Sequence, residues 1–572
     1  MWMVAVSCDL KLLYGSEIMT HYFSKQRIVA GPGFNRWLVP PASIAIHLCI
    51  GSVYAWSLFN TPLTRVFGVV GSAADDWSLQ QVVWIFTVAI VFLGFAAAFA
   101  GKWLERAGPR LVGSVAACCW GGGFLIGGLG IWLHQLWLVY LGYGALGGCG
   151  LGLGYVSPVS TLIRWFPDRR GMAAGLAIMG FGGGAIIGTP LKEWLLRYFT
   201  QLPQFLGRPD QLELLTENGR RLASVNGNLQ EVLVIGTREA SSSIPQGVYL
   251  VNTGTTGAAE TFFVLGIVYF LIMIVAAFSY RIPADNWTPP GNRIPEKPMV
   301  SRHHVEIDQA MKTPQFYLVW IVLCFNVTAG IGVLGVAKTM IIEIFGTNLT
   351  ISPGFAATYV LMISVFNMIG RFFWASASDY LGRKNTYAIF FVSGVILYLS
   401  IPFTAQRVSG SSVPGLLLVY FYAVTMLIFT MYGGGFATIP AYLADLFGTR
   451  FVGGIHGRLL TAWSTAGVLG PWAITSLREA ARNKALHQLT QKIDSFQFHE
   501  TFGASKEQLQ QLIDAKTVTL PKLMEMVPEG TTDPSATLYN STMFLMAILL
   551  AIALVANLFI QPVHPRHHID ES

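Results

Sequence analysis

An arginine inside a long apolar stretch is the residue of this chain best suited to bind an anion. Arg371 lies in FNMIGRFFW, and Asn367 precedes it by four residues, so a helix would place amide and guanidinium on one face. A charge within a membrane helix costs about 2.5 to 3.5 kcal/mol, so it usually faces a polar interior and a partner. The planar guanidinium fork suits a carboxylate. We therefore predict an organic-anion site; the alternative is that Arg371 extends to the inner membrane surface or pairs with Asp379.

Aromatic side chains in the apolar stretches are candidates to close around a small carboxylate and to exclude water. Because 13% of the residues are aromatic, most of them are expected to face lipid, lie at the interface or pack between helices. The candidates for lining the site are Tyr54, Trp56, Trp84, Tyr155, Tyr432 and Trp463.

The titratable residues of the apolar stretches offer one candidate proton carrier. His47 lies near the centre of the first stretch, and the charge of an unperturbed histidine changes close to physiological pH. We favour the alternative, a neutral histidine bonded to a neighbouring helix. No Asp or Glu lies deep in a predicted stretch, which disfavours carboxylate-based proton coupling. No metal-ligand spacing, cofactor motif or catalytic constellation is present, so neither a metal, a cofactor nor an enzyme is predicted.

The composition is that of a membrane protein. Of the 572 residues, 53% are hydrophobic and only 12% charged, outside the range of soluble domains. A membrane-spanning helix needs about 20 mostly apolar residues, and it satisfies its own backbone hydrogen bonds. The chain is therefore predicted to be an all-α polytopic membrane protein. Twelve stretches qualify, at roughly 37–59, 79–100, 111–132, 137–163, 171–191, 259–280, 314–337, 354–375, 385–404, 414–440, 451–476 and 541–562.

Basic residues gather in the short connections on one side, which predicts that both termini are cytoplasmic. This arrangement accounts for most of the net charge of +7, and no basic cluster with interleaved aromatics supports nucleic-acid binding. The six cysteines lie in the amino terminus or in predicted spans, so no disulfide framework is implied.

The sequence indicates an internal duplication. GKWLERAGPR at Gly101 recurs in altered form as ASASDYLGRK at Ala375, and the two halves align at an offset near 274 to 281 residues. Two parallel six-helix bundles are expected, with substrate held between them. The predicted organisation is a cytoplasmic segment 1–36, a bundle 37–280, a proline-rich and charged cytoplasmic linker 281–313, a bundle 314–562 and a cytoplasmic tail 563–572.

Two polar insertions, 192–258 and 477–540, occupy equivalent positions in the two halves. The first contains short runs typical of β-strands, and the second contains segments with a helical pattern. Both are expected outside the cell. They would either pack together as a cap over the pore mouth or be loop extensions without a function of their own.

The repeated loop resembles the connection after spans two and eight of the major facilitator superfamily. GSVYAWSLF, RWFPDRRGMAAGLAIMGFGGG, NMIGRFFW and LLTAWSTAGVLGP together resemble the oxalate/formate antiporter family, which is related to the monocarboxylate transporters. The resemblance implies that Arg371 binds the anion, and it ranks Tyr54 and Tyr155 first among the aromatics. Oxalate-transporting members carry a lysine where this chain has Trp463, so the resemblance favours formate, lactate or pyruvate over oxalate.

The same resemblance implies a cytoplasmic latch that stabilises an outward-open state; the alternative is a pair of solvated turns. Its residues would be Gly101, Glu105, Arg106, Gly108, Arg110, Asp379, Gly382, Arg383 and Lys384.

The function expected from these features is secondary transport of a small organic anion by alternating access, with antiport favoured. The partners would be that anion and the lipid bilayer, and the resemblance suggests a bacterial inner membrane. One alternative is a proton-coupled monocarboxylate symporter. Another is a receptor or scaffold that uses the external insertions to bind a partner.

Overall fold

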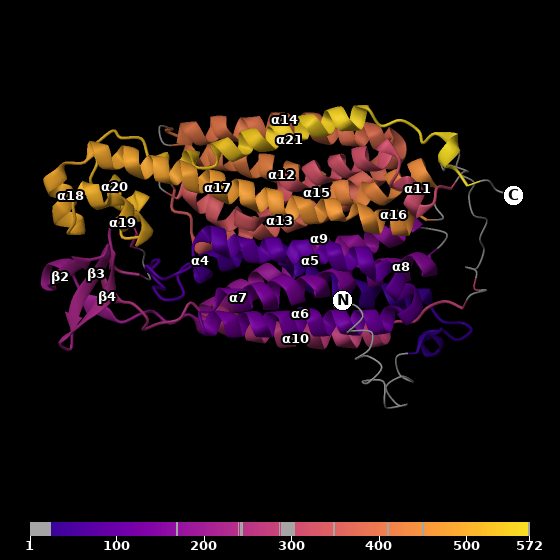
Figure 1. Ribbon diagram of the computed structural model, residues 1–572, viewed down its shortest axis with the longest axis horizontal. Coiled ribbons are helices and arrows are strands. Elements are labelled where there is room, and N and C mark those ends of the chain that lie inside the picture. Colours follow the sequence, from indigo (N-terminus) through magenta and orange to yellow (C-terminus); the bar gives the residue numbers. More distant parts are fainter. Residues whose placement is uncertain are drawn as a thin grey trace.

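Twelve membrane helices in two halves make up the body of the protein (Figure 1). The structure is a computed structural model that describes residues 24–166, 170–237, 239–240, 244–284, 287, 304–346, 349–408, 411–448 and 451–569. In chain order the spans are η2–α3–η3–α4 (Arg36–Leu38, Val39–Gly51, Ser52–Phe59, Asn60–Leu63), α5 (Leu79–Ala107), α6 (Pro109–Trp132), α7–η4–α8 (Leu136–Val139, Tyr140–Gly147, Gly148–Trp165), α9 (Arg170–Phe199), α10 (Ala258–Ser279), α12 (Pro314–Phe345), α13 (Pro353–Leu381), α14 (Arg383–Val408), α15 (Pro414–Phe447), α16–α17 (Val452–Leu459, Thr461–Lys492) and α21 (Asn540–Leu558).

Ten of these spans in the described part of the chain are long and apolar enough to cross a membrane by composition alone. The other two, α9 and α17, pack inside the bundle, α9 against α3 and α13, and α17 against α5 and α12. Their sequences are less apolar because α9 is rich in glycine and α17 continues as a charged helix to Lys492. The predicted all-α polytopic fold is confirmed.

The duplication is visible in matching helix ends. Helices α5 and α13 are both 29 residues long, and a serine caps each amino terminus, Ser78 in α5 and Ser352 in α13. Both helices end at a glycine in positive φ, Gly108 at 81° and Gly382 at 80°, a conformation that side chains disfavour. The repeated loop motif therefore encodes the same helix-terminating turn twice.

Glycines spaced by four residues allow two close helix contacts. A Cβ built on Gly152 of α8 would lie 2.4 Å from the carbonyl oxygen of Leu93 in α5. A Cβ on Gly184 of α9 would lie 2.3 Å from the carbonyl carbon of Gly51 in the first span. Any larger residue at either position would push the backbones apart.

The first span is not a continuous α-helix. Residues Ser52–Phe59 form the 3-10 segment η3, with a non-helical backbone at Ala55 (φ −94°, ψ 27°). All eight of its side chains are buried. A 3-10 stretch within a longer helix often marks a functional hinge, and this one carries two of the predicted site residues, Tyr54 and Trp56.

The two insertions pack together at one end of the bundle, where Figure 1 shows the sheet beside the short helices. The first forms an antiparallel sheet in the order β1-β5-β4-β3-β2. Thr216 Oγ1 donates to the Phe502 carbonyl at 2.8 Å, and Thr519 Oγ1 donates to Glu239 at 2.9 Å, so the sheet and the helices of the second insertion are joined directly. The elements are β1 (Phe205–Gly207), η5 (Pro209–Gln211), β2 (Leu214–Glu217), β3 (Arg220–Val225), β4 (Asn228–Ile235), β5 (Gly247–Leu250), α18 (Ser495–Phe502), η6 (Lys506–Gln508), α19 (Leu509–Asp514), α20 (Leu520–Met524) and η7 (Pro534–Thr537).

This assembly, hereafter the cap, is also attached to the loop between the first two spans. Arg220 binds Asp75 at 2.7 Å and Glu231 at 3.1 Å, and the hydrogen bonds from Arg220 lower the pKa of the Asp75 carboxyl. The first insertion starts after Phe199 rather than at residue 192, because α9 continues to that point.

The beginning and the end of the described chain lie at the opposite end of the bundle. Val29 forms a parallel bridge with Ile282, and the amide of Ile569 donates to the His304 carbonyl at 2.9 Å. The short elements here are η1 (Lys25–Ile28), α11 (Ile307–Ala310) and η8 (Pro565–His567). Residues 285, 286 and 288–303 of the predicted linker lie outside the described residues.

Candidate functional site

Arg371 lies in the centre of α13 and is buried, with 1% of its surface exposed. Its Nε donates to Asn367 Oδ1 at 3.0 Å, as the four-residue spacing predicted. Its two terminal nitrogens donate to acceptors of the first half of the chain: Nη1 to the Ile178 carbonyl at 3.1 Å and Nη2 to the Tyr54 hydroxyl at 3.3 Å. Arg371 therefore joins the two halves of the protein by hydrogen bonds.

Helix α9 approaches Arg371 closely because it carries a glycine there. A Cβ on Gly182 would lie 2.7 Å from Arg371 Nε. The Gly182 carbonyl also accepts a hydrogen bond from Ser364 of α13 at 2.5 Å. A glycine at this position leaves the guanidinium room to reach Ile178 one turn earlier.

Three aromatic side chains contact the guanidinium, and three more pack against these. The carbon at its centre lies 5.3 Å from the Phe436 ring centroid and 6.0 Å from that of Phe181. The Trp463 ring packs against both phenylalanines, at centroid distances of 4.6 Å and 5.6 Å. We call this group the aromatic enclosure; it comprises Tyr54, Tyr155, Phe181, Tyr432, Phe436 and Trp463, all buried.

The tyrosine hydroxyls of the enclosure leave hydrogen-bonding capacity for a ligand. Tyr432 donates to the Tyr54 oxygen at 3.4 Å, and Arg371 donates to the same oxygen. Because that oxygen accepts both bonds, the Tyr54 hydroxyl proton remains free to be donated. The Trp463 Nε1 and the Asn367 Nδ2 are also buried without a hydrogen-bond partner among the described residues. The site is therefore rich in donors.

No carboxylate pairs with Arg371 within the described part of the chain, where all its hydrogen-bond acceptors are neutral. The side chain of Asp379, the alternative partner, is outside the described residues. A buried cation that lacks a counter-charge is expected to attract an anion strongly, because the surrounding rings exclude water and lower the local dielectric. The enclosure is sealed in this conformation, so an anion would have to be occluded here or enter after the halves move.

The structure gathers four of the six predicted aromatics around Arg371, namely Tyr54, Tyr155, Tyr432 and Trp463. Trp56 instead packs at 4.6 Å from Tyr143, within the first half. Trp84 is a half-buried residue of α5 that has no recorded contact with the enclosure.

His47 lies beside the enclosure. Its ring meets those of Tyr155 and Phe181 edge to face at 5.5 Å and 6.3 Å. It is fully buried. Neither of its ring nitrogens has a hydrogen-bond partner among the described residues, so the bond to a neighbouring helix that we favoured is not seen and the role of His47 remains a prediction.

The analysis of the sequence missed Phe181 and Phe436. Each lies beside a run of glycines, in GFGGG of α9 and GGGF of α15. An aromatic ring flanked by residues without side chains can protrude between helices, and this pattern was the available signal.

The latch residues that the structure describes contact their own half. Arg110 Nη2 donates to the Phe278 carbonyl at 3.0 Å, in α10. Arg383 pairs with Asp445 at 3.4 Å, and Lys384 Nζ donates to the Leu558 carbonyl at 2.7 Å. The side chains of Glu105, Arg106 and Asp379, like Gly101, are outside the described part of the structure, so the latch remains a prediction.

These observations define a polytopic membrane carrier with two six-helix halves that meet at a buried cation. The chain matches the model of the Major Facilitator Superfamily over residues 42–205 and 244–471. It belongs to this superfamily of transporters and is not an enzyme.

Comparison with known proteins supports the resemblance to the oxalate/formate antiporters. The chain is 24% identical to the oxalate:formate antiporter of Oxalobacter formigenes over 438 residues, which cover 76% of this chain and 83% of that protein. It is 21% identical to apicoplast pyruvate carrier 1 of Toxoplasma gondii over 470 residues, covering 72% and 78%. Monocarboxylate transporter 13 of Rattus norvegicus is 31% identical over 137 residues, 23% of this chain and 31% of that protein.

Among solved structures, a bacterial homologue of the human lysosomal transporter Spinster, inward-facing and occupied, has the same fold. Its TM-score is 0.59 at 13% identity, with 95% of this chain and all of that chain covered.

Proposed function

We propose that this protein exchanges small monocarboxylates, such as formate, lactate or pyruvate, across a bacterial inner membrane, with the carboxylate bound by Arg371. The observation that carries the proposal is a guanidinium without an acidic partner among the described residues, enclosed by aromatic rings between the two halves. The relatives named for oxalate, formate, pyruvate and monocarboxylates agree with this chemistry. Both termini would be cytoplasmic and the cap external.

The geometry suggests how binding and movement of the halves are linked. A carboxylate would accept from both terminal nitrogens of Arg371 and so replace its present acceptors, Ile178 and Tyr54, which belong to the other half. Tyr54 would then donate its free proton to the bound anion. Binding of the substrate would thus replace a direct hydrogen bond between the halves by a contact made through the anion. The relative free energies of the carrier's conformations would therefore differ between the occupied and the empty protein.

A monocarboxylate fits the enclosure better than oxalate. Lys192 is a second buried cation, but it follows Gly182 by ten residues on α9, about 15 Å along the axis at 1.5 Å per residue. The two carboxylates of oxalate are directly bonded to one another and cannot span that distance. One cation and several apolar ring faces suit a single carboxylate with a small apolar substituent.

The direct test is uptake of labelled formate, lactate, pyruvate and oxalate into liposomes that contain the purified protein. Uptake that depends on unlabelled internal carboxylate would support exchange. Uptake driven by a pH gradient without internal carboxylate would favour the proton-coupled symporter instead. A folded protein that moves none of the monocarboxylates would contradict the proposal.

An ion pair between the halves is predicted to hold the cap end closed. Lys338 of α12 binds Glu193 of α9 at 2.8 Å, and both side chains are largely buried. We expect Lys338→Met to shift the carrier toward a state open at the cap end. Glu193 would keep only the exposed Arg197, at 3.3 Å, and a partly buried carboxylate that loses a partner costs about 1 to 3 kcal/mol. Distances between spin labels on α9 and α12 at this end would report the shift.

The control for this prediction is the double variant Glu193→Gln with Lys338→Met, which leaves neither charge unpaired. Its distance distribution should lie closer to the wild type than that of the single variant. Equal distributions for the wild type and Lys338→Met would show that the pair does not hold the gate.

A further inference from the structure

Lys192 is a fully buried cation that the proposed binding site does not use. It lies on α9, and its Nζ donates to the carbonyl oxygen of Ser52 at 2.6 Å. The same nitrogen lies 5.1 Å from the ring centroid of Phe59. The neighbouring acid, Glu193, is bound to Lys338 instead, and no other described carboxylate forms an ion pair with Lys192. The partners recorded for Lys192 are therefore both in the η3 segment.

The contact falls where the first span changes its helical form. Ser52 is the first residue of η3, and Phe59 is the last. A carbonyl oxygen has two lone pairs, so that of Ser52 can accept a bond from Lys192 in addition to a backbone bond. The bond ties a side chain of α9 to the first residue of the irregular segment.

The η3 segment carries Tyr54, the hydroxyl that Arg371 contacts at 3.3 Å. Tyr54 lies two residues after Ser52 and one residue before Ala55, whose backbone is non-helical. The direction of the Tyr54 side chain is therefore set by how this irregular segment is fixed at its start. Lys192 fixes it from α9.

Helix α9 also holds the segment by backbone contact. A Cβ on Gly184 would lie 2.5 Å from the Ser52 nitrogen, and one on Gly188 would lie 3.1 Å from the Ser52 Cβ. The same helix supplies the Ile178 carbonyl to Arg371. Helix α9 thus sets the positions of the two Arg371 acceptors that belong to the first half, Ile178 directly and Tyr54 through Lys192 and Ser52.

We propose that Lys192 is a positioning residue of the anion site: it anchors the 3-10 segment so that the Tyr54 hydroxyl faces Arg371 and the bound carboxylate. The inference deepens the proposed function and rests on it. Lys192 does not touch the substrate, so its removal acts on affinity through Tyr54.

The test compares Lys192→Met, which keeps the chain length but removes the donor, with Tyr54→Phe and with the double variant. We expect each single variant to raise the KM for the transported monocarboxylate about tenfold, the loss of one hydrogen bond to a charged group, with little change in maximal rate. The KM of the double variant should be no higher than that of the single variant with the higher KM. Lys192→Arg, which keeps a charged donor, should restore most of the affinity.

Hydrogen exchange of the Ser52–Phe59 amides gives a readout that does not need substrate. It should be faster in Lys192→Met and unchanged in Tyr54→Phe. Independent, multiplying effects on KM, or unchanged exchange in Lys192→Met, would overturn the inference. If Lys192→Met does not fold, Lys192→Leu, which also lacks a donor, serves in both measurements, with the same outcomes.

Failure of the proposed function is distinguishable from failure of this inference. If the wild type moves no carboxylate while exchange at Ser52–Phe59 still depends on Lys192, then the substrate assignment fails and the anchoring of the segment stands. If the wild type transports normally and exchange is insensitive to Lys192, the positioning role fails alone.

Discussion

Replacing Arg371 with alanine is expected to reduce carboxylate uptake at least 100-fold. The guanidinium is the only described cation within the aromatic enclosure, and a buried charge-assisted pair loses several kcal/mol when one partner is removed. Arg371→Lys should keep some uptake with a raised KM, because an ammonium retains the charge but not the two parallel bonds. Initial rates of labelled monocarboxylate uptake in liposomes would measure both effects.

A matched control is available in the same half of the protein. Arg407 is an exposed residue of α14 that lies over the ring of Phe403 at 3.6 Å. Arg407→Ala should leave uptake unchanged. If Arg371→Ala remains folded, as judged by size-exclusion chromatography, and transports at a rate near that of the wild type, the anion site is elsewhere.

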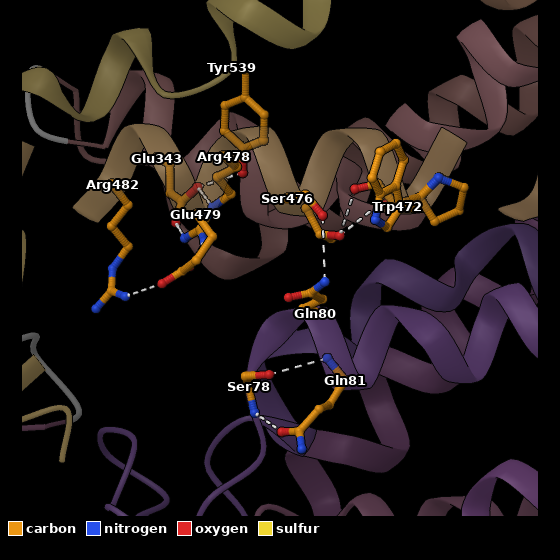
Figure 2. Close-up of polar contacts among 12 residues, drawn as sticks. Ser78, Gln80, Gln81, Glu343, Trp472, Ser476, Arg478, Glu479, Arg482 and Tyr539 are labelled. Atoms are coloured by element: carbon orange, nitrogen blue, oxygen red, sulfur yellow. Dashed lines mark hydrogen bonds and ion pairs between the residues drawn. The ribbon is translucent and has the colours of Figure 1, made fainter. Parts of the chain in front are cut away.

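Glu343→Gln is expected to cause the largest loss of stability. Glu343 of α12 binds Arg478 of α17 through both carboxylate oxygens, and Tyr539 donates to the same carboxylate (Figure 2). The cluster joins three spans of the second half near the cap. Arg478 would keep only the more exposed Glu479, at 3.5 Å. Breaking a buried pair costs about 3 to 5 kcal/mol, so the midpoint of thermal unfolding in detergent should fall by several degrees.

The neighbouring ion pair offers a control for this prediction. Arg482 binds Glu479 at 2.9 Å on the more exposed face of α17 (Figure 2). Arg482→Ala should cost less than about 1 kcal/mol, as exposed pairs usually do. Equal losses for Glu343→Gln and Arg482→Ala would show that the Glu343 cluster is not a stabilising centre.

Figure 2 also shows a contact between the halves at this end of the bundle. Gln80 of α5 donates to Ser476 of α17 at 3.5 Å. The charged extension of α17, which starts near this contact, continues into the cap. Movement of the two halves would therefore reach the cap through α17 as well as through α9 and the loop that carries Asp75.

The sequence by itself determined the class of protein, the twelve helices and the duplication. Apolar stretches and terminating glycines are local features: lipid requires each helix to satisfy its own backbone, and a positive φ requires glycine. The same local reasoning identified Arg371 with Asn367, since four residues make one helical turn. Four of the aromatics that it named as candidates lie near the arginine in the structure; they were named from their position in apolar stretches and, for Tyr54 and Tyr155, from the family resemblance.

The tertiary structure decided which side chains face one another, because that depends on the rotation of each helix and on breaks in it. Tyr54 and Trp56 are two residues apart and therefore point to different faces of the segment, and the fold decides that Tyr54 meets Arg371 while Trp56 packs in its own half. Lys192 looked like the first residue of a polar insertion. It is buried because α9 continues past it and the first span offers the Ser52 carbonyl for it to bind. Helix rotation and long-range pairing of this kind have no local signature, so only the folded arrangement could reveal them.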